Sequence, residues 1–449
     1  MVGELVESLP ESWRVCRLDE VATIVDSLHK TPTYSLTGHP MVRVTDVQGG
    51  FLDVSKSLRV TDEVFQEFTH RYAPKRGDIV FSRVGSYGNA SYANTDTPFC
   101  LGQNTALLSP RISGRFLHFF LQSTEARRQI EHAVVGSTQK TISLKSISAL
   151  QVPVPPPHEL EAIAHILGTL DDKIELNRRM NETLEAMARA LFKSWFVDFD
   201  PVCAKAEGRD PGLPKPLASL FPARLVDSEL GEIPEGWKVV PLSDLTTVIT
   251  KGTTPTQEDV ETAPQDDPPV RYVRVNAIDG DGEILFDKLT TIPESVHLGV
   301  LKRSVLRAKD VLYTIAGTIG RVSIVGEPLL PANTNQAVAV IRPRSNVPSA
   351  FLALAMRQDA FREELHSNIV HAVQANLSLG MLSKARVAVP PEGTLPELFA
   401  PSEALVGQAT LARSRSRTLG ALRDALLPRL ISGELRVHLA QELLSEAQR

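Results

Sequence analysis

Cysteine is scarce in this chain, with three residues among 449. Cys16, Cys100 and Cys203 lie far apart and form no Cys-x-x-Cys pair and no cluster with histidine. We therefore expect reduced thiols in a cytoplasmic protein, without a zinc site. The histidines are scattered as well and show no metal-ligand spacing, so the sequence predicts no bound metal.

Long hydrophobic runs are also missing. No apolar segment approaches the ~18 residues that a membrane-spanning helix needs. The acidic start, residues 1–7, has no apolar core segment of the kind found in a signal peptide. Hydrophobic residues make up 42% and charged residues 22%, which is typical of globular protein. The length allows two or three domains with full cores.

Familiar catalytic motifs are absent. The chain contains no GxxxxGK[ST] phosphate loop, no HExxH and no GxSxG. Residues 267–270, Asp-Pro-Pro-Val, are similar to the Asp-Pro-Pro-aromatic loop of adenine methyltransferases. However, Val270 cannot stack on a flipped base and no glycine-rich cofactor loop precedes it. We interpret this segment as a proline-rich loop insert and expect no catalytic residue and no cofactor.

An excess of basic charge is missing too. The chain has 48 Lys and Arg against 53 Asp and Glu, a net charge of −5. Simple DNA-binding modules usually have a pI above ~9. DNA binding by this chain therefore requires basic residues gathered on one face, or a partner subunit that supplies much of the phosphate contact.

What the chain does have is an internal repeat. Leu-Pro-Glu-Ser-Trp at 9–13 matches Ile-Pro-Glu-Gly-Trp at 233–237, and residues 116–156 match residues 351–391 at one constant offset. A repeat of this length is a whole domain rather than a solenoid unit of 20–50 residues. Two similar domains indicate a pseudo-symmetric molecule that grips its target with two similar halves, and duplex DNA is the leading example.

Proline-rich stops divide the chain into alternating domains and helices. Val-Pro-Val-Pro-Pro-Pro at 152–157 ends the first domain, and Val-Ala-Val-Pro-Pro at 387–391 ends the second. Long helical patterns follow both, over about 158–195 and 402–427. We expect a first globular domain over 1–157, a long helix over 158–198, a linker over 199–232, a second globular domain over 233–392, a second long helix over 393–435 and a tail over 436–449.

The two helical patterns carry apolar seams close to a heptad repeat. We predict a mixed α/β (α+β) fold in which two pseudo-symmetric globular domains are separated by these helices, paired as an antiparallel coiled coil. The alternative is amphipathic packing of each helix within its own domain. The predicted seam and subunit-contact residues are Ile163, Leu170, Ile174, Leu184, Leu191, Trp195 and Phe196 in the first helix, with Leu405, Leu419, Leu422 and Leu426 in the second.

These features together resemble a known family. Asp-Asp-Lys-Ile-Glu-Leu-Asn at 171–177 and the segment 184–199, which includes Phe-Lys-Ser-Trp-Phe, resemble the central region of specificity (S) subunits of Type I restriction–modification systems. The duplicated Leu-Pro-Glu-Ser-Trp, Gly-Asp-Ile-Val and Val-Pro-Val-Pro-Pro motifs resemble it too. The second helix departs from the pattern, since Pro428 and a Leu-Ile-Ser-Gly turn replace the aromatic ending. The tail after it has no counterpart in the first half.

The resemblance implies a DNA-recognition subunit. Each globular half is then a target recognition domain that reads one half of a bipartite, asymmetric site in double-stranded DNA. The helices space the domains and dock two methyltransferase (modification) subunits, which carry S-adenosylmethionine and the methylation chemistry. Motor-nuclease (restriction) subunits join for restriction, and the specificity subunit itself is not catalytic.

Three polar places in each half are candidates for contact with DNA, because Arg, Lys, amide and hydroxyl side chains read base edges or phosphates. They are a glycine-bracketed loop, an amide-containing turn between apolar strands, and a Gln-containing stretch; early polar loops at 29–35 and 251–257 are further candidates. The side chains are Arg83, Ser86, Tyr87, Gln103, Asn104, Gln139 and Lys140 in the first half, with Lys251, Thr318, Arg321, Asn335, Gln336, Gln374 and Asn376 in the second.

These places also fit roles that do not involve DNA bases. The glycine loops also fit tight turns without a ligand, and the amides also fit local turn bonding. Gln139 and Gln374 coincide in the repeat, which favours a shared structural or phosphate role over sequence-specific reading. At the level of the whole chain, the alternatives are an interaction scaffold without DNA binding and an enzyme with a cryptic site.

Overall fold

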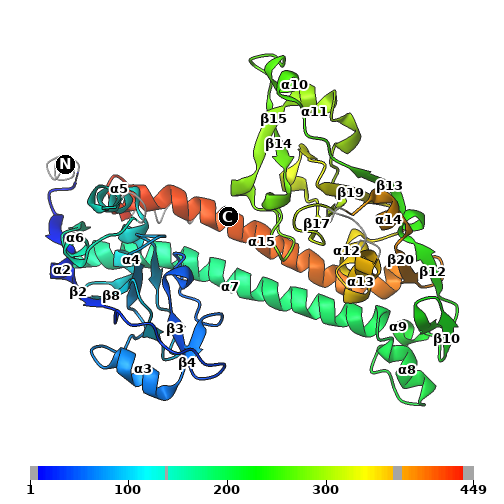
Figure 1. The fold of residues 1–449 in the computed structure, drawn as a ribbon, viewed down its shortest axis with the longest axis horizontal. Helices are drawn as coiled ribbons and strands as arrows, with labels where there is room; N and C mark the ends of the chain where they lie inside the picture. Colours follow the sequence, from blue (N-terminus) through cyan, green and yellow to red (C-terminus); the bar gives the residue numbers. More distant parts are fainter. Residues whose placement is uncertain (1–8, 137–139, 368–376, 438–449) are drawn as a thin grey trace. The chain divides into compact units, whose positions relative to one another are not determined.

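The computed structural model describes residues 9–136, 140–367 and 377–437. The chain forms two compact units, one from residues 1–179 with 412–449 and the other from residues 180–411. Each unit contains one globular domain together with parts of two long helices, α7 (Pro157–Phe196) and α15 (Leu395–Ile431). Figure 1 shows the elements along the chain.

Over its described residues, the first domain has three sheets. β2 (Ala22–Asp26), β8 (Thr105–Pro110), β5 (Ile79–Ser82) and β6 (Ala90–Tyr92) form a four-stranded antiparallel sheet in that order. β4 (Leu58–Val60), β3 (His39–Val42) and β7 (Cys100–Leu101) form a second, in which β3 and β7 are parallel. β1 (Arg14–Arg17) pairs with β9 (Gln151–Val154). The helices are α2 (Leu18–Val21), α3 (Asp62–Thr69), α4 (Gly114–Gln122), α5 (Thr124–Ala133) and α6 (Leu144–Ser148).

The second domain repeats this topology. β13 (Thr246–Lys251), β19 (Val338–Pro343), β16 (Val311–Thr314) and β17 (Val322–Ile324) form the four-stranded sheet. β15 (Thr290–Pro293), β14 (Pro269–Val273) and β18 (Ala332–Thr334) form the three-stranded sheet, and β14 is parallel to β18. β12 (Lys238–Pro241) pairs with β20 (Arg386–Val389). The helices are α10 (Gln257–Glu261), α11 (Glu294–Leu298), α12 (Ser349–Met356), α13 (Asp359–Ser367) and α14 (Leu379–Lys384).

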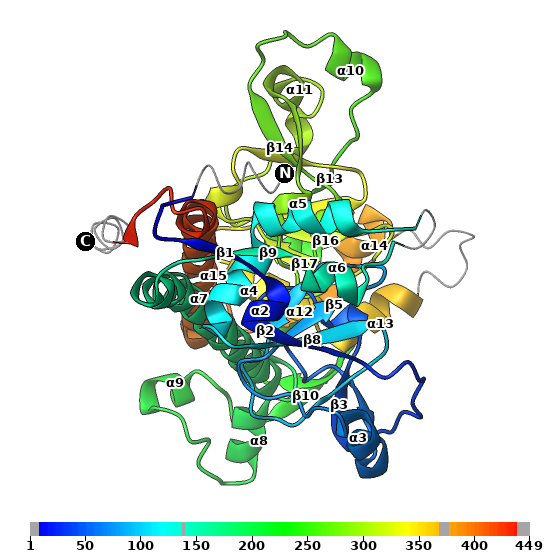
Figure 2. The same ribbon diagram turned by 90° about the vertical axis from the view of Figure 1, so that its left-hand side faces the viewer.

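The sequence pattern predicts one helix over 116–132, but the structure has two, α4 and α5. The chain turns extended at Ser123, whose hydroxyl oxygen accepts a hydrogen bond from the Ala126 amide at 3.2 Å. A serine N-cap therefore starts a new helix inside an otherwise helical pattern. Figure 2 looks onto the first unit, where α5 packs against both α4 and α6.

The segment expected as a linker is more ordered than its proline content indicates. Residues 199–232 contain α8 (Asp200–Ala206), α9 (Lys215–Ser219), β10 (Leu225–Ser228) and the start of β11 (Gly231–Pro234), which pairs with β10. Lys205 Nζ donates to the carbonyls of Ala218 and Phe221, both at 2.6 Å. These bonds tie α8 to the end of α9. Pro201 and Pro216 lie in the first turns of these helices, where a proline is tolerated.

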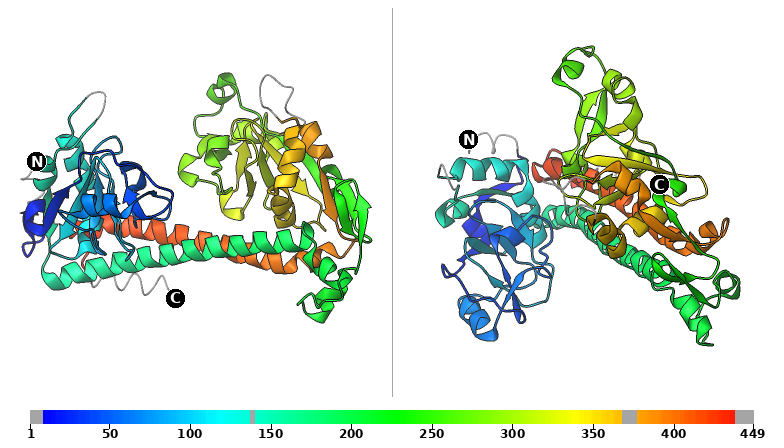
Figure 3. Two further views of the ribbon diagram at one scale, coloured as in Figure 1. Left: turned by 60° about the horizontal axis from the view of Figure 1, so that its bottom comes forward. Right: turned by 45° about the vertical axis from the view of Figure 1, so that its right-hand side comes forward.

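Prolines also set where the long helices begin. Pro157 is the first residue of α7, a position where the missing backbone N–H costs nothing. The second long helix starts at Leu395, close to the expected start at 393 and before the helical pattern over 402–427. Within the first unit the beginning of α7 lies against the end of α15, and within the second unit the end of α7 lies against the beginning of α15 (Figure 3). The helices are thus antiparallel neighbours in each unit.

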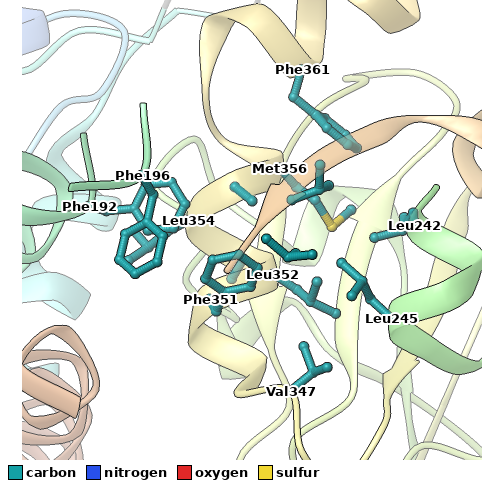
Figure 4. Close-up of a cluster of buried hydrophobic side chains, with 14 of the residues drawn as sticks. Phe192, Phe196, Leu242, Leu245, Val347, Phe351, Leu352, Leu354, Met356 and Phe361 are labelled. Atoms are coloured by element: carbon teal, nitrogen blue, oxygen red, sulfur yellow. The ribbon is translucent and has the colours of Figure 1, made fainter. Parts of the chain in front are cut away.

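The helix ends belong to the cores of their units. In the first unit, Leu160, Ile163, Leu167 and Leu170 of α7 and Leu426 and Leu430 of α15 join the buried cluster that contains Phe116 and Phe120 of α4. In the second unit the cluster combines aromatic rings with aliphatic side chains (Figure 4). The Phe196 ring lies 5.4 Å from that of Phe351 and 5.7 Å from that of Trp237. The sequence pattern leaves core packing and helix pairing as alternatives. The structure shows both at these helix ends.

Candidate nucleic-acid interface

The three candidate places of the first domain meet at one residue. The Arg83 amide donates to the carbonyl of Asn104 at 2.9 Å, and the Arg83 carbonyl accepts from the amide of Ile142 at 3.0 Å. The Gly85 amide donates to the carbonyl of Lys140 at 3.3 Å. Backbone hydrogen bonds therefore join the glycine loop to the amide turn on one side and to the Lys140 segment on the other.

The second domain builds the same junction around Ile315. Its amide donates to the carbonyl of Ala337 at 2.8 Å, and its carbonyl accepts from the amide of Leu377 at 2.9 Å. Arg83 and Ile315 directly follow the equivalent strands β5 and β16. The convergence of loops far apart in sequence is thus a property of the fold, independent of the side chains at the junction.

A hydroxyl fixes the shape of each glycine loop. In the first domain the Ser82 hydroxyl donates to the carbonyl of Ser86 and accepts from the amide of Asn89 at 3.0 Å. Gly85 and Gly88 have φ values of 72° and 81°, a region that favours glycine. This arrangement leaves Ser86 exposed at the tip.

The second loop is closed in the same way. Thr314 donates to the carbonyl of Thr318 and accepts from the amide of Arg321 at 2.9 Å, and Thr318 is exposed. The Arg321 guanidinium is half-buried and donates to the carbonyl of Ile278. The equivalent Asn89 donates to the carbonyl of Val47 at 3.2 Å. Arg321 and Asn89 therefore share a structural role: each binds a backbone carbonyl outside its glycine loop.

Cations surround the aromatic ring of the first loop. Tyr87 is half-buried, with the guanidinium of Arg127 5.5 Å and the ammonium of Lys140 5.9 Å from its ring centre. Lys140 is exposed, and Arg127 also donates to the Tyr87 carbonyl at 3.2 Å. A tyrosine between two cations on a loop tip is suited to contact a phosphate or a base.

The remaining candidate side chains differ in whether they are exposed and free to contact a ligand. Lys251 and Gln336 are exposed, although the Thr254 hydroxyl donates to the Gln336 carbonyl oxygen. Asn335 is half-buried and its side-chain oxygen accepts from the Ala337 amide at 3.3 Å. Arg83 is also half-buried and forms an ion pair with Asp26. Asn335 and Arg83 therefore act in turn or loop structure.

Two candidates of the amide turn, Gln103 and Asn104, are half-buried. Asn104 adopts a φ of 65°, which asparagine tolerates better than most residues. Gln139, Gln374 and Asn376 lie outside the described residues.

Arginines that recur in both domains are missing from the set predicted from sequence. Arg127 and Arg362 each donate to a carbonyl of their glycine loop, to Tyr87 at 3.2 Å and to Gly320 at 3.4 Å. Arg43 and Arg274 directly follow β3 and β14. The repeat itself held this signal, because Arg-Val at 43–44 aligns with Arg-Val at 274–275.

The predicted seam residues divide into three groups by burial. Ile163, Leu170 and Leu426 are buried in the first unit, and Trp195 and Phe196 are buried in the second. Partly buried residues pack on the same clusters: Leu419 and Leu422 in the first unit, Leu191 and Leu405 in the second. Ile174 and Leu184 are half-buried in the middle of α7.

Metal and membrane sites find no support in the described part of the chain. Within residues 9–136, 140–367 and 377–437, no group of three or more His, Cys, Asp or Glu side chains is placed to hold a metal ion. None of the described helices is long and apolar enough to cross a membrane.

Comparisons with known proteins agree on one family. The family described as Type I restriction modification DNA specificity domain matches residues 10–186 and again residues 234–394. The Type I restriction enzyme HindI specificity subunit of Haemophilus influenzae is 28% identical over 413 residues, covering 81% of this chain and 87% of the relative. The MjaIX specificity subunit of Methanocaldococcus jannaschii is 23% identical, covering 96% of this chain and 95% of the relative.

A solved structure has the same fold. The Type I restriction–modification S subunit from M. genitalium matches with a TM-score of 0.59 at 14% identity. The match covers 94% of this chain and 98% of that chain.

Proposed function

We propose a function from one premise: the chain belongs to the Type I restriction modification DNA specificity family. It is the DNA sequence-recognition subunit of a Type I restriction–modification complex. Each globular domain reads one half of a bipartite, asymmetric site in double-stranded DNA. The chain itself carries no catalysis, and the complex works in the cytoplasm.

One observation carries this proposal: the same three-loop junction occurs in both domains. The junctions at Arg83 and Ile315 have the same backbone bonds but different side chains around them. Recognition of two different half-sequences requires a constant backbone frame with variable side chains, because the DNA backbone is constant and the base edges vary. The exposed side chains proposed to contact DNA are Ser86, Lys140, Lys251, Thr318 and Gln336, together with the half-buried Tyr87.

Exposed apolar side chains on the long helices support the docking of partner subunits. In the second unit, Met187 and Leu411 are both 51% exposed and Met180 is 42% exposed. Met180 and Met187 lie seven residues apart on α7, a spacing at which apolar anchors of one helix contact a partner. We propose that two methyltransferase subunits bind the helices and bring S-adenosylmethionine, and that motor-nuclease subunits join this complex.

The test measures affinity for duplex DNA with and without the methyltransferase subunits, at several salt concentrations. We expect affinity that falls linearly in log–log form with salt and a methylated motif with two separated parts. Replacing residues 9–157 by the equivalent domain of a relative should change one part of the motif only. An interaction scaffold would show no duplex affinity beyond that of the methyltransferase subunits. Methyl transfer by the isolated chain would contradict the non-catalytic role.

A further inference from the structure

We infer that Arg43 and Arg274 are matched phosphate contacts, one in each domain, that anchor the two recognition domains on the DNA backbone whatever sequence each one reads. This inference rests on the proposed function and adds to it a pair of positioning residues. It does not involve the exposed candidate side chains named above.

Sheet topology places each arginine beside the amide turn. Arg43 follows β3 and Gly102 follows β7, and these strands are parallel neighbours, so both residues leave the sheet at one edge. The Gly102 amide donates to the carbonyl of Val42 at 2.8 Å. A Cβ at Gly102 would lie 3.2 Å from Cγ of Arg43, so the arginine stem runs directly over the turn.

The second domain repeats this placement. Arg274 follows β14, and the parallel neighbour β18 leads into Asn335, whose amide donates to the carbonyl of Val273 at 3.3 Å. A Cβ at Gly317 would lie 3.8 Å from the side chain of Val275, so the segment after Arg274 also touches the glycine loop. Each arginine is thus part of the surface that gathers the candidate loops.

The charge of Arg274 has no carboxylate partner in the described part of the chain. Its guanidinium is exposed and lies 5.8 Å from the ring centre of Tyr272. Burial raises the pKa of Tyr272, so this ring is neutral at physiological pH and does not neutralise the arginine. Tyr272 instead donates its hydroxyl hydrogen to the carbonyl of Thr253 at 2.8 Å.

Arg43 is held more firmly but remains accessible. Its amide donates to Asp46 at 2.9 Å, whereas its guanidinium approaches the same carboxylate only at 3.4 Å. The Arg43 side chain is 37% exposed, and its buried Nε has no hydrogen-bond partner. The second domain has Ala277 at the position of Asp46, so the acid is not needed to place the arginine.

Two other pairs of cations that both domains share do different work or lie elsewhere. Arg127 and Arg362 donate to carbonyls of the glycine loops. Lys75 and Arg307 come before β5 and β16, at the opposite end of those strands from the loops. The pair at 43 and 274 combines recurrence, exposure and contact with the candidate surface.

Recurrence favours a phosphate over a base as the ligand. Two domains that read different half-sites share only the sugar–phosphate backbone. A residue that read a base edge would be free to differ between the domains, as the exposed loop residues Ser86 and Thr318 do. An arginine identical in both copies at an equivalent position fits the invariant part of the target.

The experiment compares Arg43→Gln and Arg274→Gln, alone and together, in the complex with the methyltransferase subunits. Affinity is measured at several salt concentrations for a duplex carrying the methylated motif of the host and for an unrelated duplex. We expect each single variant to weaken both duplexes by the same factor, and the salt slope to fall by about one for each arginine removed. The methylated motif should stay unchanged.

Controls separate this inference from the proposed function. Arg43→Lys and Arg274→Lys keep the charge and should keep the slope, and Lys75→Gln with Arg307→Gln should leave slope and affinity as in the wild type. An unchanged slope in the folded double glutamine variant overturns the inference, as does a motif relaxed in one half. A wild-type complex without salt-dependent duplex affinity refutes the proposed function instead.

Discussion

Asp26 in the first domain and Lys251 in the second occupy the same place in the fold. Asp26 pairs with Ala106 in the register of β2 and β8, and Lys251 pairs with Ala339 in the register of β13 and β19. In the first domain Asp26 forms an ion pair with Arg83. In the second, Ile315 replaces the arginine and is buried, and Lys251 is exposed.

The comparison distinguishes features that both domains share, which the fold requires, from side chains that differ between the domains. The backbone bonds at the junction, the loop hydroxyls and the glycines recur in both domains. The side chains at the junction change from an ion pair to an apolar residue with a nearby lysine. The first junction is therefore electrically neutral at these two positions, whereas the second carries a positive charge toward solvent.

The contacts of the long helices also differ between the units, with polar contacts in the first and apolar contacts in the second. In the first unit Arg423 donates to the buried carboxylate of Asp171 at 2.7 Å, and Arg115 donates to the carbonyl of Gly168 at 3.1 Å. Burial raises the pKa of Asp171 even though Arg423 opposes the shift. The second unit uses the aromatic cluster around Phe196 in place of these polar contacts.

The largest expected effect is on the aromatic cluster. Phe196→Ala should destabilise the second unit by about 3–5 kcal/mol, because it removes a ring that contacts four others and leaves a cavity. Hydrogen exchange should show the loss in the second domain while the first domain stays protected. Met187→Ala, an exposed residue of α7, is the matched control. Equal loss of protection in both domains would contradict separate cores.

The next effect concerns acid stability of the first unit. Burial lowers the pKa of His118 to about 3, and the equivalent residue in the second domain is Ala353. Below a pH of about 6.5 the unfolded chain binds a proton that the folded unit does not, so this group removes about 2 kcal/mol of stability by about pH 5. His118→Leu should flatten the loss of stability between about pH 7 and pH 5 in the first unit.

Unfolding at a series of pH values checks this expectation. Burial also lowers the pKa of His297 in the second domain, so part of the acid sensitivity should remain in the second unit after the change. A variant as acid-sensitive as the wild type in the first unit would exclude His118 as the cause.

Changes at the equivalent positions Asp26 and Lys251 should have a smaller effect on stability. Asp26→Ala leaves the half-buried Arg83 without its carboxylate and should cost on the order of 1–2 kcal/mol. Lys251→Ala should change stability by less than ~0.5 kcal/mol but weaken duplex binding and reduce its salt slope. The double variant Asp26→Lys with Arg83→Ile copies the second domain and should recover stability. Failure to recover would mean that the two junctions are not interchangeable.

A smaller loss of stability than that of Asp26→Ala is expected for the loop hydroxyls that both domains share. Ser82→Ala and Thr314→Ala each remove one loop hydroxyl and should cost about 1 kcal/mol, equally in the two domains. Denaturant unfolding with domain-resolved hydrogen exchange measures both losses. A cost in only one domain would show that the loops are closed by different means.

By itself the sequence determined the order of domains and helices. The duplicated motifs and the proline-rich stops at 152–157 and 387–391 act locally, since proline fixes its own backbone and removes a donor wherever it stands. For this reason the start of α7 at Pro157 lies next to the expected position. The candidate loops also followed from local signals, because glycine and amide turns are short-range features.

Only the tertiary structure decided how these loops meet and which side chains remain available. Arg83 is held by Asp26, 57 residues earlier, and Arg321 by the carbonyl of Ile278, 43 residues earlier. Sequence spacing carries no information on such bonds, because strand pairing brings the partners together. The same pairing left Lys251 exposed where Asp26 is bound, and it set Arg43 and Arg274 at the sheet edges beside the amide turns.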